Sequence, residues 1–120
     1  MKSTFIVLFI FAFVVTGCYN DSEEELYNCS VDAAGTKYST TLAAIFNSYG
    51  CISCHNNGAP SGGVALENYA GVKAAVTSAR LFGAVNHDPG FAPMPQGGSK
   101  MNACDIKKIK AWIDAGAPNN

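Results

Sequence analysis

Two cysteines and a histidine stand together near the middle of the chain, in the pattern Cys51-Ile52-Ser53-Cys54-His55. One helical turn brings the two thiols to the same side, where each can add to a vinyl group of one porphyrin. His55 follows directly, so its neutral imidazole can bind the porphyrin iron. The motif predicts one covalently attached haem c, with Cys51 and Cys54 as attachment residues and His55 as an axial iron ligand. The chain must then fold around that group.

Other uses of the same motif remain open at this point. A thioredoxin-like redox pair needs a βαβ context, and no such context is visible in the sequence. A structural zinc site usually needs four ligands, and His87 is the only other histidine. The motif could also occur by chance on a surface loop. A secretion signal ahead of it favours haem, because haem c is attached outside the cytoplasm.

The first residues have the features of such a signal. Lys2 precedes an unbroken apolar run over residues 5–15, shorter than the roughly 20 residues that a membrane-spanning helix needs. A basic residue, a short apolar stretch and small residues after it predict a secretory signal peptide rather than a buried helix. Val15-Thr16-Gly17-Cys18 resembles the bacterial lipoprotein signal, although Val15 replaces the usual Leu. We therefore expect a signal peptide over residues 1–17 and lipidation of Cys18, with ordinary cleavage nearby as the alternative.

The segment after Cys18 predicts a solvated tether. Four acidic residues crowd into five positions, and like charges at this density repel one another; they are Asp21, Glu23, Glu24 and Glu25. We assign residues 18–38 to the lipidated cysteine, this tether and an N-terminal extension, and residues 39–120 to one folded domain. From Cys29 onward the chain has seven basic and five acidic residues, too weak an excess for a nucleic-acid-binding face.

The sequence of the folded part, residues 39–120, predicts an all-α structure of about three helices with long loops. The first helix follows the possible caps Ser39-Thr40 and ends at Gly50; the second lies in Glu67 to Thr77; the third begins after Asn102 and ends before Gly116. Apolar residues at i, i+3, i+4 spacing define one face of each; they are Leu42, Ile45, Phe46 and Tyr49, then Tyr69, Val72 and Val76, then Ile106, Ile109 and Ile113 with Trp112. Gly- and Pro-rich loops separate the helices. Such a thin core needs a staple or a large prosthetic group.

Here the sequence resembles the class I cytochrome c family, most closely its small planctomycete-type bacterial domains. The resemblance covers about residues 39–118 and is carried by the motif at residues 51–55, Ser61 to Leu66 with Tyr69, Pro93-Met94-Pro95 with Gly97-Gly98, and Ile109 to Ala117. It implies an all-helical fold around a haem, with the first and last helices crossing, His–Met ligation of the iron, and electron transfer.

Met94 is the expected second axial ligand. Pro93 and Pro95 restrict the backbone around it, so its sulfur can be presented at low entropy cost, and thioether ligation suits an electron carrier. The alternative is a loop residue that fills the core. His87 is the rival ligand, in a turn that we expect to be solvated. Met101 has no rigid flanking residues and is a weaker candidate ligand than Met94 or His87.

Cys29 and Cys104 are left over once the other three cysteines are assigned. In an oxidising compartment they are expected to form a disulfide between the start of the domain and the last helix. Two separate or buried thiols are the alternative.

The expected function is one-electron transfer by a monohaem cytochrome, and not enzymatic catalysis, with redox proteins as partners and the membrane contacted through the lipid. An electron-donating subunit of a larger oxidoreductase and a haem-based sensor remain alternatives. Tyr19 is not the Asp that retains many lipoproteins at the inner membrane, which favours the outer membrane of the cell envelope. The acidic run loosely resembles a surface-export signal, so the side of that membrane stays open.

Overall fold

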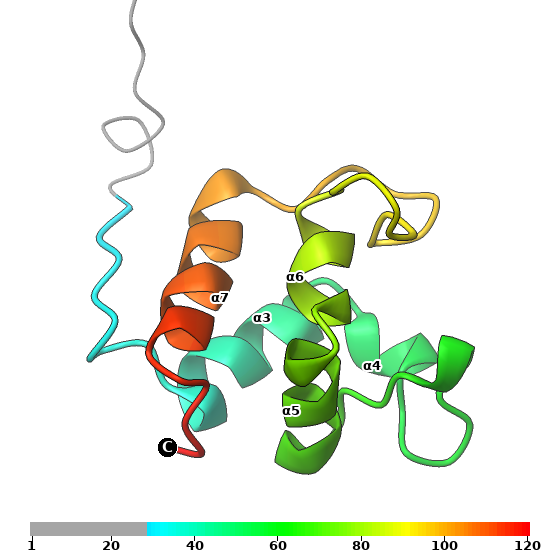
Figure 1. The fold of residues 1–120 in the computed structure, drawn as a ribbon, viewed down its shortest axis with the longest axis horizontal. Helices are drawn as coiled ribbons and strands as arrows, with labels where there is room; N and C mark the ends of the chain where they lie inside the picture. The colour runs from blue at the N-terminus through cyan, green and yellow to red at the C-terminus, as the bar shows by residue number, and fades with distance from the viewer. Residues whose placement is uncertain (1–28) are drawn as a thin grey trace, which may run out of the picture.

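The computed structural model describes residues 29–120, and within this range the chain forms helices and no strand (Figure 1). The all-α class predicted from the sequence is confirmed for this part of the chain. The predicted signal peptide, Cys18 and the acidic tether lie outside the described residues. Over residues 29–120 no helix has both the length and the apolarity to cross a bilayer.

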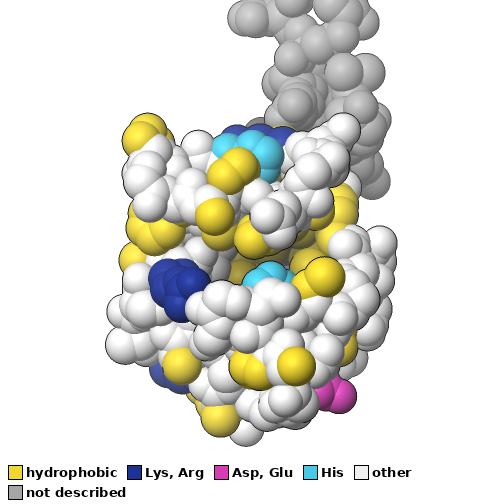
Figure 2. Space-filling model, turned by 90° about the vertical axis from the view of Figure 1, so that its right-hand side faces the viewer, with side chains coloured by type: hydrophobic (Ala, Val, Ile, Leu, Met, Phe, Trp, Pro, Cys, Tyr) yellow, Lys and Arg dark blue, Asp and Glu magenta, His cyan; other side chains and the backbone are white. Residues whose placement is uncertain are grey.

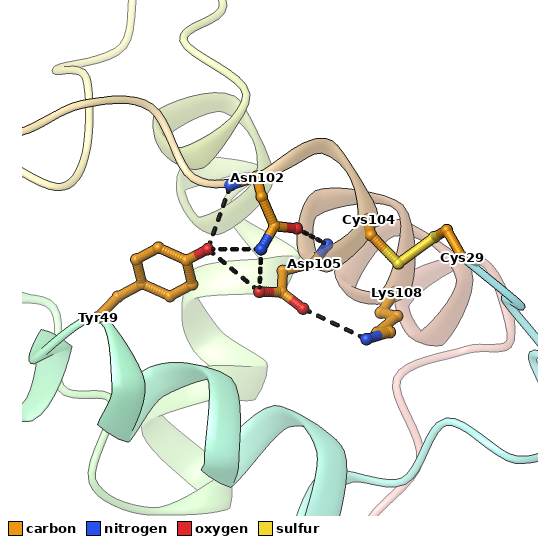
Figure 3. The surroundings of a disulfide bond; sticks show 6 residues. All are labelled: Cys29, Tyr49, Asn102, Cys104, Asp105 and Lys108. Atoms are coloured by element: carbon orange, nitrogen blue, oxygen red, sulfur yellow. Dashed lines mark hydrogen bonds and ion pairs between the residues drawn. A yellow bond between two sulfur atoms is a disulfide. The ribbon is translucent and has the colours of Figure 1, made fainter. Parts of the chain in front are cut away.

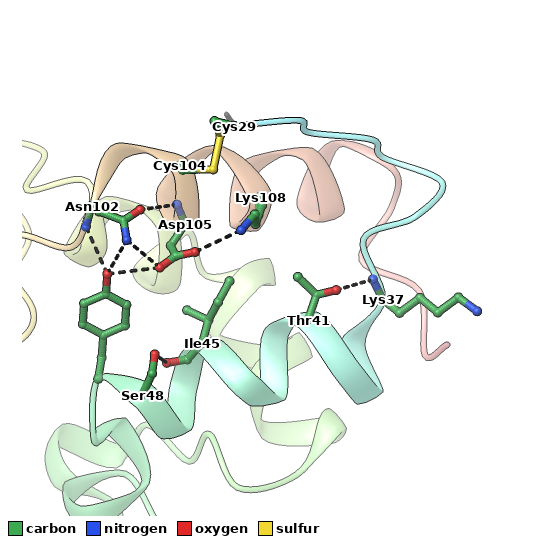
Figure 4. Close-up of polar contacts among 10 residues, drawn as sticks. Cys29, Lys37, Thr41, Ile45, Ser48, Asn102, Cys104, Asp105 and Lys108 are labelled. Carbon is green, nitrogen blue, oxygen red and sulfur yellow. Dashed lines mark hydrogen bonds and ion pairs between the residues drawn. A yellow bond between two sulfur atoms is a disulfide. The ribbon is translucent and has the colours of Figure 1, made fainter. Parts of the chain in front are cut away.

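The first helical segment consists of the π-helix η1 (Tyr38–Leu42), which continues directly into α3 (Ala43–Ser48). It buries Leu42, Ile45 and Phe46, the face that the apolar spacing predicted. It begins before the expected caps, and the hydroxyl of Thr41 accepts a hydrogen bond from the Lys37 amide at 3.4 Å (Figure 4). Gly50 adopts a φ of 65°, a left-handed conformation that glycine tolerates. The one-turn helix α4 (Cys51–Cys54) therefore starts in a new direction.

Helix α5 (Tyr69–Thr77) follows the short 3₁₀ segment η2 (Ser61–Gly63). The side chain of Asn68 caps it by accepting from the Gly71 amide, so the helix begins two residues after the expected Glu67. A Cβ on Gly71 would overlap the carbonyl oxygen of Ala65. The glycine that weakened the sequence prediction is thus needed for the close approach of this helix to the preceding loop.

Helix α6 (Arg80–Val85) was not predicted from the sequence. It follows Ala79, whose φ is 58°, and buries Leu81, Gly83 and Val85. It packs on α5 and on the last helix. Helices α4 and α6 together raise the number of helices above the three that were expected. Helix α6 also shortens the long loop that was expected between the second and third predicted helices.

Helix α7 (Ala103–Asp114) is capped by Asn102, whose side-chain oxygen accepts from the Asp105 amide at 2.8 Å. Its buried residues are Ile106, Ile109 and Trp112, while Ile113 is only half-buried. Trp112, fully buried, stacks on Tyr38 of η1 with ring centroids 6.1 Å apart. Figure 1 shows α7 running across the η1–α3 segment, so the two ends of the domain close one core.

A disulfide joins Cys29 to Cys104 in the first turn of α7, across 75 residues of sequence (Figure 3). This is the pair that the other cysteine assignments left over. It fixes the chain that leads into η1 against the outer side of α7.

Candidate haem site

A cavity of about 580 Å³ opens between α4, α6 and the two glycine- and proline-rich loops. Figure 2 shows it as a hollow with hydrophobic side chains around it and a histidine inside. Most of its wall is apolar; the larger apolar residues on it are Phe46, Val64, Leu66, Leu81, Val85, Phe91, Met94 and Met101. Its size lies within the roughly 300–1,000 Å³ of ordinary ligand sites.

Helix α4 brings Cys51 and Cys54 to the wall of this cavity, and neither forms a disulfide. Cys51 is half-buried and Cys54 exposed. Burial raises the pKa of the Cys51 thiol above its ordinary value, so it stays protonated at neutral pH. Redox-active cysteine pairs instead depend on a lowered thiol pKa. The environment of Cys51 therefore disfavours the thioredoxin-like alternative.

His55 also lies on the wall, and a backbone carbonyl holds its ring. Its Nδ1 is 2.9 Å from the carbonyl oxygen of Val64. A carbonyl oxygen only accepts, so Nδ1 carries the proton, and in the neutral ring Nε2 then has the lone pair. The backbone carbonyl of His55 also accepts from the Leu66 amide at 2.7 Å. This is the support that metal-binding imidazoles typically have: one nitrogen donates to the protein and the other is free for the metal.

Met94 lies on the same wall, and its backbone is held on both sides. Its amide donates to the carbonyl oxygen of Ala84 in α6 at 3.0 Å. Its own carbonyl oxygen accepts from Nε2 of His87 at 3.0 Å. The segment between Pro93 and Pro95 is therefore fixed to α6 and to the turn that follows it.

The rival ligands have different positions. His87 is half-buried and is not part of the cavity wall, because its ring is turned to the Met94 carbonyl. The solvated turn expected for this residue is therefore only partly solvated. Met101, ranked lowest from the sequence, is 4% exposed and does line the cavity. The structure thus brings His55, Met94 and Met101 to one cavity and leaves His87 behind Met94.

Tyr49 connects this wall to the start of α7 (Figure 3). Its hydroxyl donates to a carboxylate oxygen of Asp105 at 3.1 Å and accepts from the backbone and side-chain nitrogens of Asn102 at 3.1 and 3.0 Å. Burial, above all, raises the pKa of Tyr49, so the hydroxyl stays neutral at neutral pH. Tyr49, two residues before the start of α4, is thereby tied to the cap of the last helix.

Sequence reasoning missed Arg80 and Phe91, which both line the cavity. Phe91 stands in a loop without periodicity, and Arg80 opens a helix that was not predicted. In the described range, no three His, Cys, Asp or Glu side chains gather as a metal-binding group. The wall carries the imidazole of His55 and the thioethers of Met94 and Met101, together with the thiols of Cys51 and Cys54. No protein-family model, curated protein or solved structure matches the chain.

Proposed function

We propose that this protein is a monohaem c-type cytochrome of the class I kind that carries single electrons. The observation that carries the proposal is the His55 ring, which is tied through Nδ1 to Val64 and keeps Nε2 free on a wall shared with Cys51 and Cys54. Two thiols one helical turn apart, followed by an oriented imidazole, are the groups that covalent haem attachment and iron ligation need.

The residues of the cavity suit that group chemically. Cys51 and Cys54 would hold a haem covalently, and His55 and Met94 would supply its axial ligands. The bound haem would supply one-electron chemistry at its iron. The largely apolar wall suits a porphyrin, and a thioether ligand raises the reduction potential relative to a second imidazole. A half-exposed attachment turn leaves one edge of the site close to solvent, where a redox partner can approach.

The test is expression of the full chain in cells that attach haem c, followed by the pyridine haemochrome spectrum of the denatured protein. The wild type is expected to show one covalent haem per chain, and Cys51→Ala with Cys54→Ala to show none. Ser53→Ala, inside the same turn, is the matched control and should keep the haem. A wild-type protein without covalent haem in such cells refutes the proposal.

Carbon monoxide separates the carrier from the haem-based sensor. An iron with both axial positions filled by His55 and Met94 should leave the ferrous spectrum unchanged under carbon monoxide. A spectrum that shifts at once indicates an open or labile position and favours the sensor. Copurification with a fixed redox enzyme would instead favour the electron-donating subunit.

We also propose that the protein is anchored in the cell envelope through a lipid on Cys18, with the outer membrane as its destination. Cys18→Ser should release it into the soluble fraction. Protease treatment of intact cells then decides the side: cleavage of the haem domain places it outside, and protection until the outer membrane is opened places it in the periplasm.

A further inference from the structure

A second groove, of about 540 Å³, lies along the first turns of α7 and the loop before it. Two buried apolar residues line it, Met101 and Ile106, and Met101 also lines the candidate haem cavity. Lys100 and Lys107 stand on its wall, and both are exposed. Its described lining includes no Asp or Glu. The groove therefore combines an apolar lining with two positive charges.

These two lysines are not neutralised by the described part of the chain. The basic residues that form ion pairs within residues 29–120 are Lys108 and Lys110. Lys100 donates to the neutral side-chain oxygen of Asn86 at 3.4 Å. Exposed lysines are stable in water and need no partner for their own sake. An occupant of the groove must therefore be argued from what the fold places beside it.

The disulfide brings a strongly acidic stretch of sequence to the edge of this groove. Cys104 is one of the lining residues, and its sulfur is bonded to Cys29 (Figure 3). Glu25 precedes Cys29 by four residues, and Glu23 precedes it by six. An extended chain spans about 3.5 Å per residue, so Glu23 lies within about 21 Å of the groove's edge and Glu25 within about 14 Å.

We infer that residues 23–27 of this chain bind in the groove. The glutamates at residues 23–25 pair with Lys100 and Lys107, and Leu26 and Tyr27 cover part of the apolar lining. The segment expected from the sequence to be a solvated spacer is thus, over these five residues, a ligand of the domain that follows it.

Charge and connectivity both favour this occupant. Residues 19–28 contain four acidic residues and no basic one, whereas residues 29–120 contain seven basic and five acidic residues. Exposed ion pairs are individually weak. The disulfide makes the binding intramolecular, however, and a short link of this kind gives an effective concentration on the order of millimolar. Weak contacts therefore suffice to fill the groove.

The bound segment also fixes how the domain faces the membrane, a consequence that rests on the proposed lipid at Cys18. Glu23 is five residues from Cys18, a span of at most about 18 Å, whereas Cys29 is 11 residues away, a span of at most about 40 Å. Binding therefore keeps the groove side of α7 near the bilayer. Redox partners would then approach the domain from its other sides.

The experiment measures how fast a glutamate-specific protease cleaves the mature protein after residues 23–25, with the products identified by mass. Lys100→Gln combined with Lys107→Gln is compared with the wild type. Two exposed ion pairs of ordinary strength predict cleavage about fivefold faster in this variant at low salt. High salt screens exposed charges and should remove the difference. Cleavage after Glu67, which all the proteins share, serves as the internal reference.

The matched control is Lys37→Gln combined with Lys110→Gln, which removes two charges from exposed positions outside the groove. It should be cleaved at the wild-type rate. Equal rates in all three proteins overturn the inference, as does an equal acceleration in the control. Introducing Glu at residues 100 and 107 together with Lys at residues 24 and 25 should restore a carbodiimide cross-link between the two segments, which either pair of substitutions alone abolishes.

The same cross-linking on the wild type identifies the occupant directly. Isotope-labelled and unlabelled chains are mixed, and links from residues 23–25 to Lys100 or Lys107 are expected within one chain. Links between chains would assign the groove to a second copy and overturn the inference. Links spread equally to Lys37, or no link and no protection, would leave the groove to an external acidic partner and overturn it as well. Neither readout depends on haem, so a failure of the proposed function is seen separately.

Discussion

Nε2 of His87 lies 3.0 Å from the carbonyl oxygen of Met94. A carbonyl oxygen only accepts, so Nε2 carries the proton and this nitrogen is not offered to a metal ion. The Met94 amide is bound at the same time by the carbonyl oxygen of Ala84. The histidine that competed with Met94 as an iron ligand therefore supports the loop that presents Met94.

Removing this support should loosen the sulfur ligand without replacing it. His87 has a φ of 58°, so His87→Gly removes the imidazole and suits the left-handed backbone. A hydrogen bond of this kind contributes about 1 kcal/mol, which predicts that added imidazole displaces Met94 from ferric iron about fivefold faster. Stopped-flow absorbance measures this rate. Ser99→Gly, in the exposed part of the same loop, is the control, and equal rates in all three proteins would contradict the role.

The ligand assignment itself rests on Met94. Met94→Ala should abolish the weak near-infrared sulfur–iron band of the ferric protein and lower the midpoint potential, within the roughly 0.8 V range that axial ligands set. Met101→Leu is the matched control because it removes the other thioether of the cavity wall. If the band survives Met94→Ala and disappears in Met101→Leu, the ligand is Met101.

The sequence allowed a sound prediction of the two helices that hold the core. Regular apolar spacing marked Leu42, Ile45 and Phe46 in the first helix and Ile106 and Ile109 in the last, and all five are buried. Periodicity succeeds here because each helix presents one face to the other. Ile113, predicted for the same stripe, is half-buried and packs against this core, while Trp112 beside it is fully buried and stacks on Tyr38.

The walls of the cavity were much harder to predict. Helix α6 has six residues, and the residue before it, Ala79, has a positive φ and no side-chain cap. Nothing local therefore marks its start, and contacts with α5 and α7 stabilise it. Arg80 and Phe91 depend on this helix and on an aperiodic loop for their positions. Their places on the wall follow from tertiary packing, which spacing along the chain does not encode.

The Cys29–Cys104 disulfide should stabilise the domain without contributing to the cofactor site. It closes a loop across 75 residues, for which the chain-entropy model gives about 4 kcal/mol. Neither cysteine lines the cavity. Replacing both by Ser should lower the free energy of unfolding by up to that amount in guanidinium titrations of the holoprotein, with the haem spectrum unchanged.

Peptide mapping under non-reducing conditions checks the bond directly. The wild-type holoprotein should yield the Cys29 and Cys104 peptides linked to each other. Recovery of both cysteines as alkylated free thiols would contradict the pairing. A loss of haem absorbance in the double Ser variant would contradict the conclusion that the disulfide does not contribute to the cavity.

The packing of Phe91 against Gly83 makes the cavity wall sensitive to one methyl group. A Cβ on Gly83 would lie within 2.6 Å of Cγ of the Phe91 ring, so Gly83→Ala forces the ring or helix α6 to move. Overpacking of this kind typically costs about 1–3 kcal/mol. We expect a loss of stability of this size in denaturant titrations. We also expect a changed Soret circular dichroism signal, because Phe91 lines the cavity.

Two further variants separate this clash from a general effect of replacing glycine. Gly98→Ala is the control, since its nearest neighbour would be Cβ of Pro95 at an ordinary 3.5 Å, and it should leave both signals near the wild type. Phe91→Leu, added to Gly83→Ala, shortens the opposing side chain and should recover part of the lost stability. If the two substitutions are simply additive, the ring and the glycine are not in contact. The conclusion that α6 packs closely on the 91–96 loop, and so positions Met94, would then be wrong.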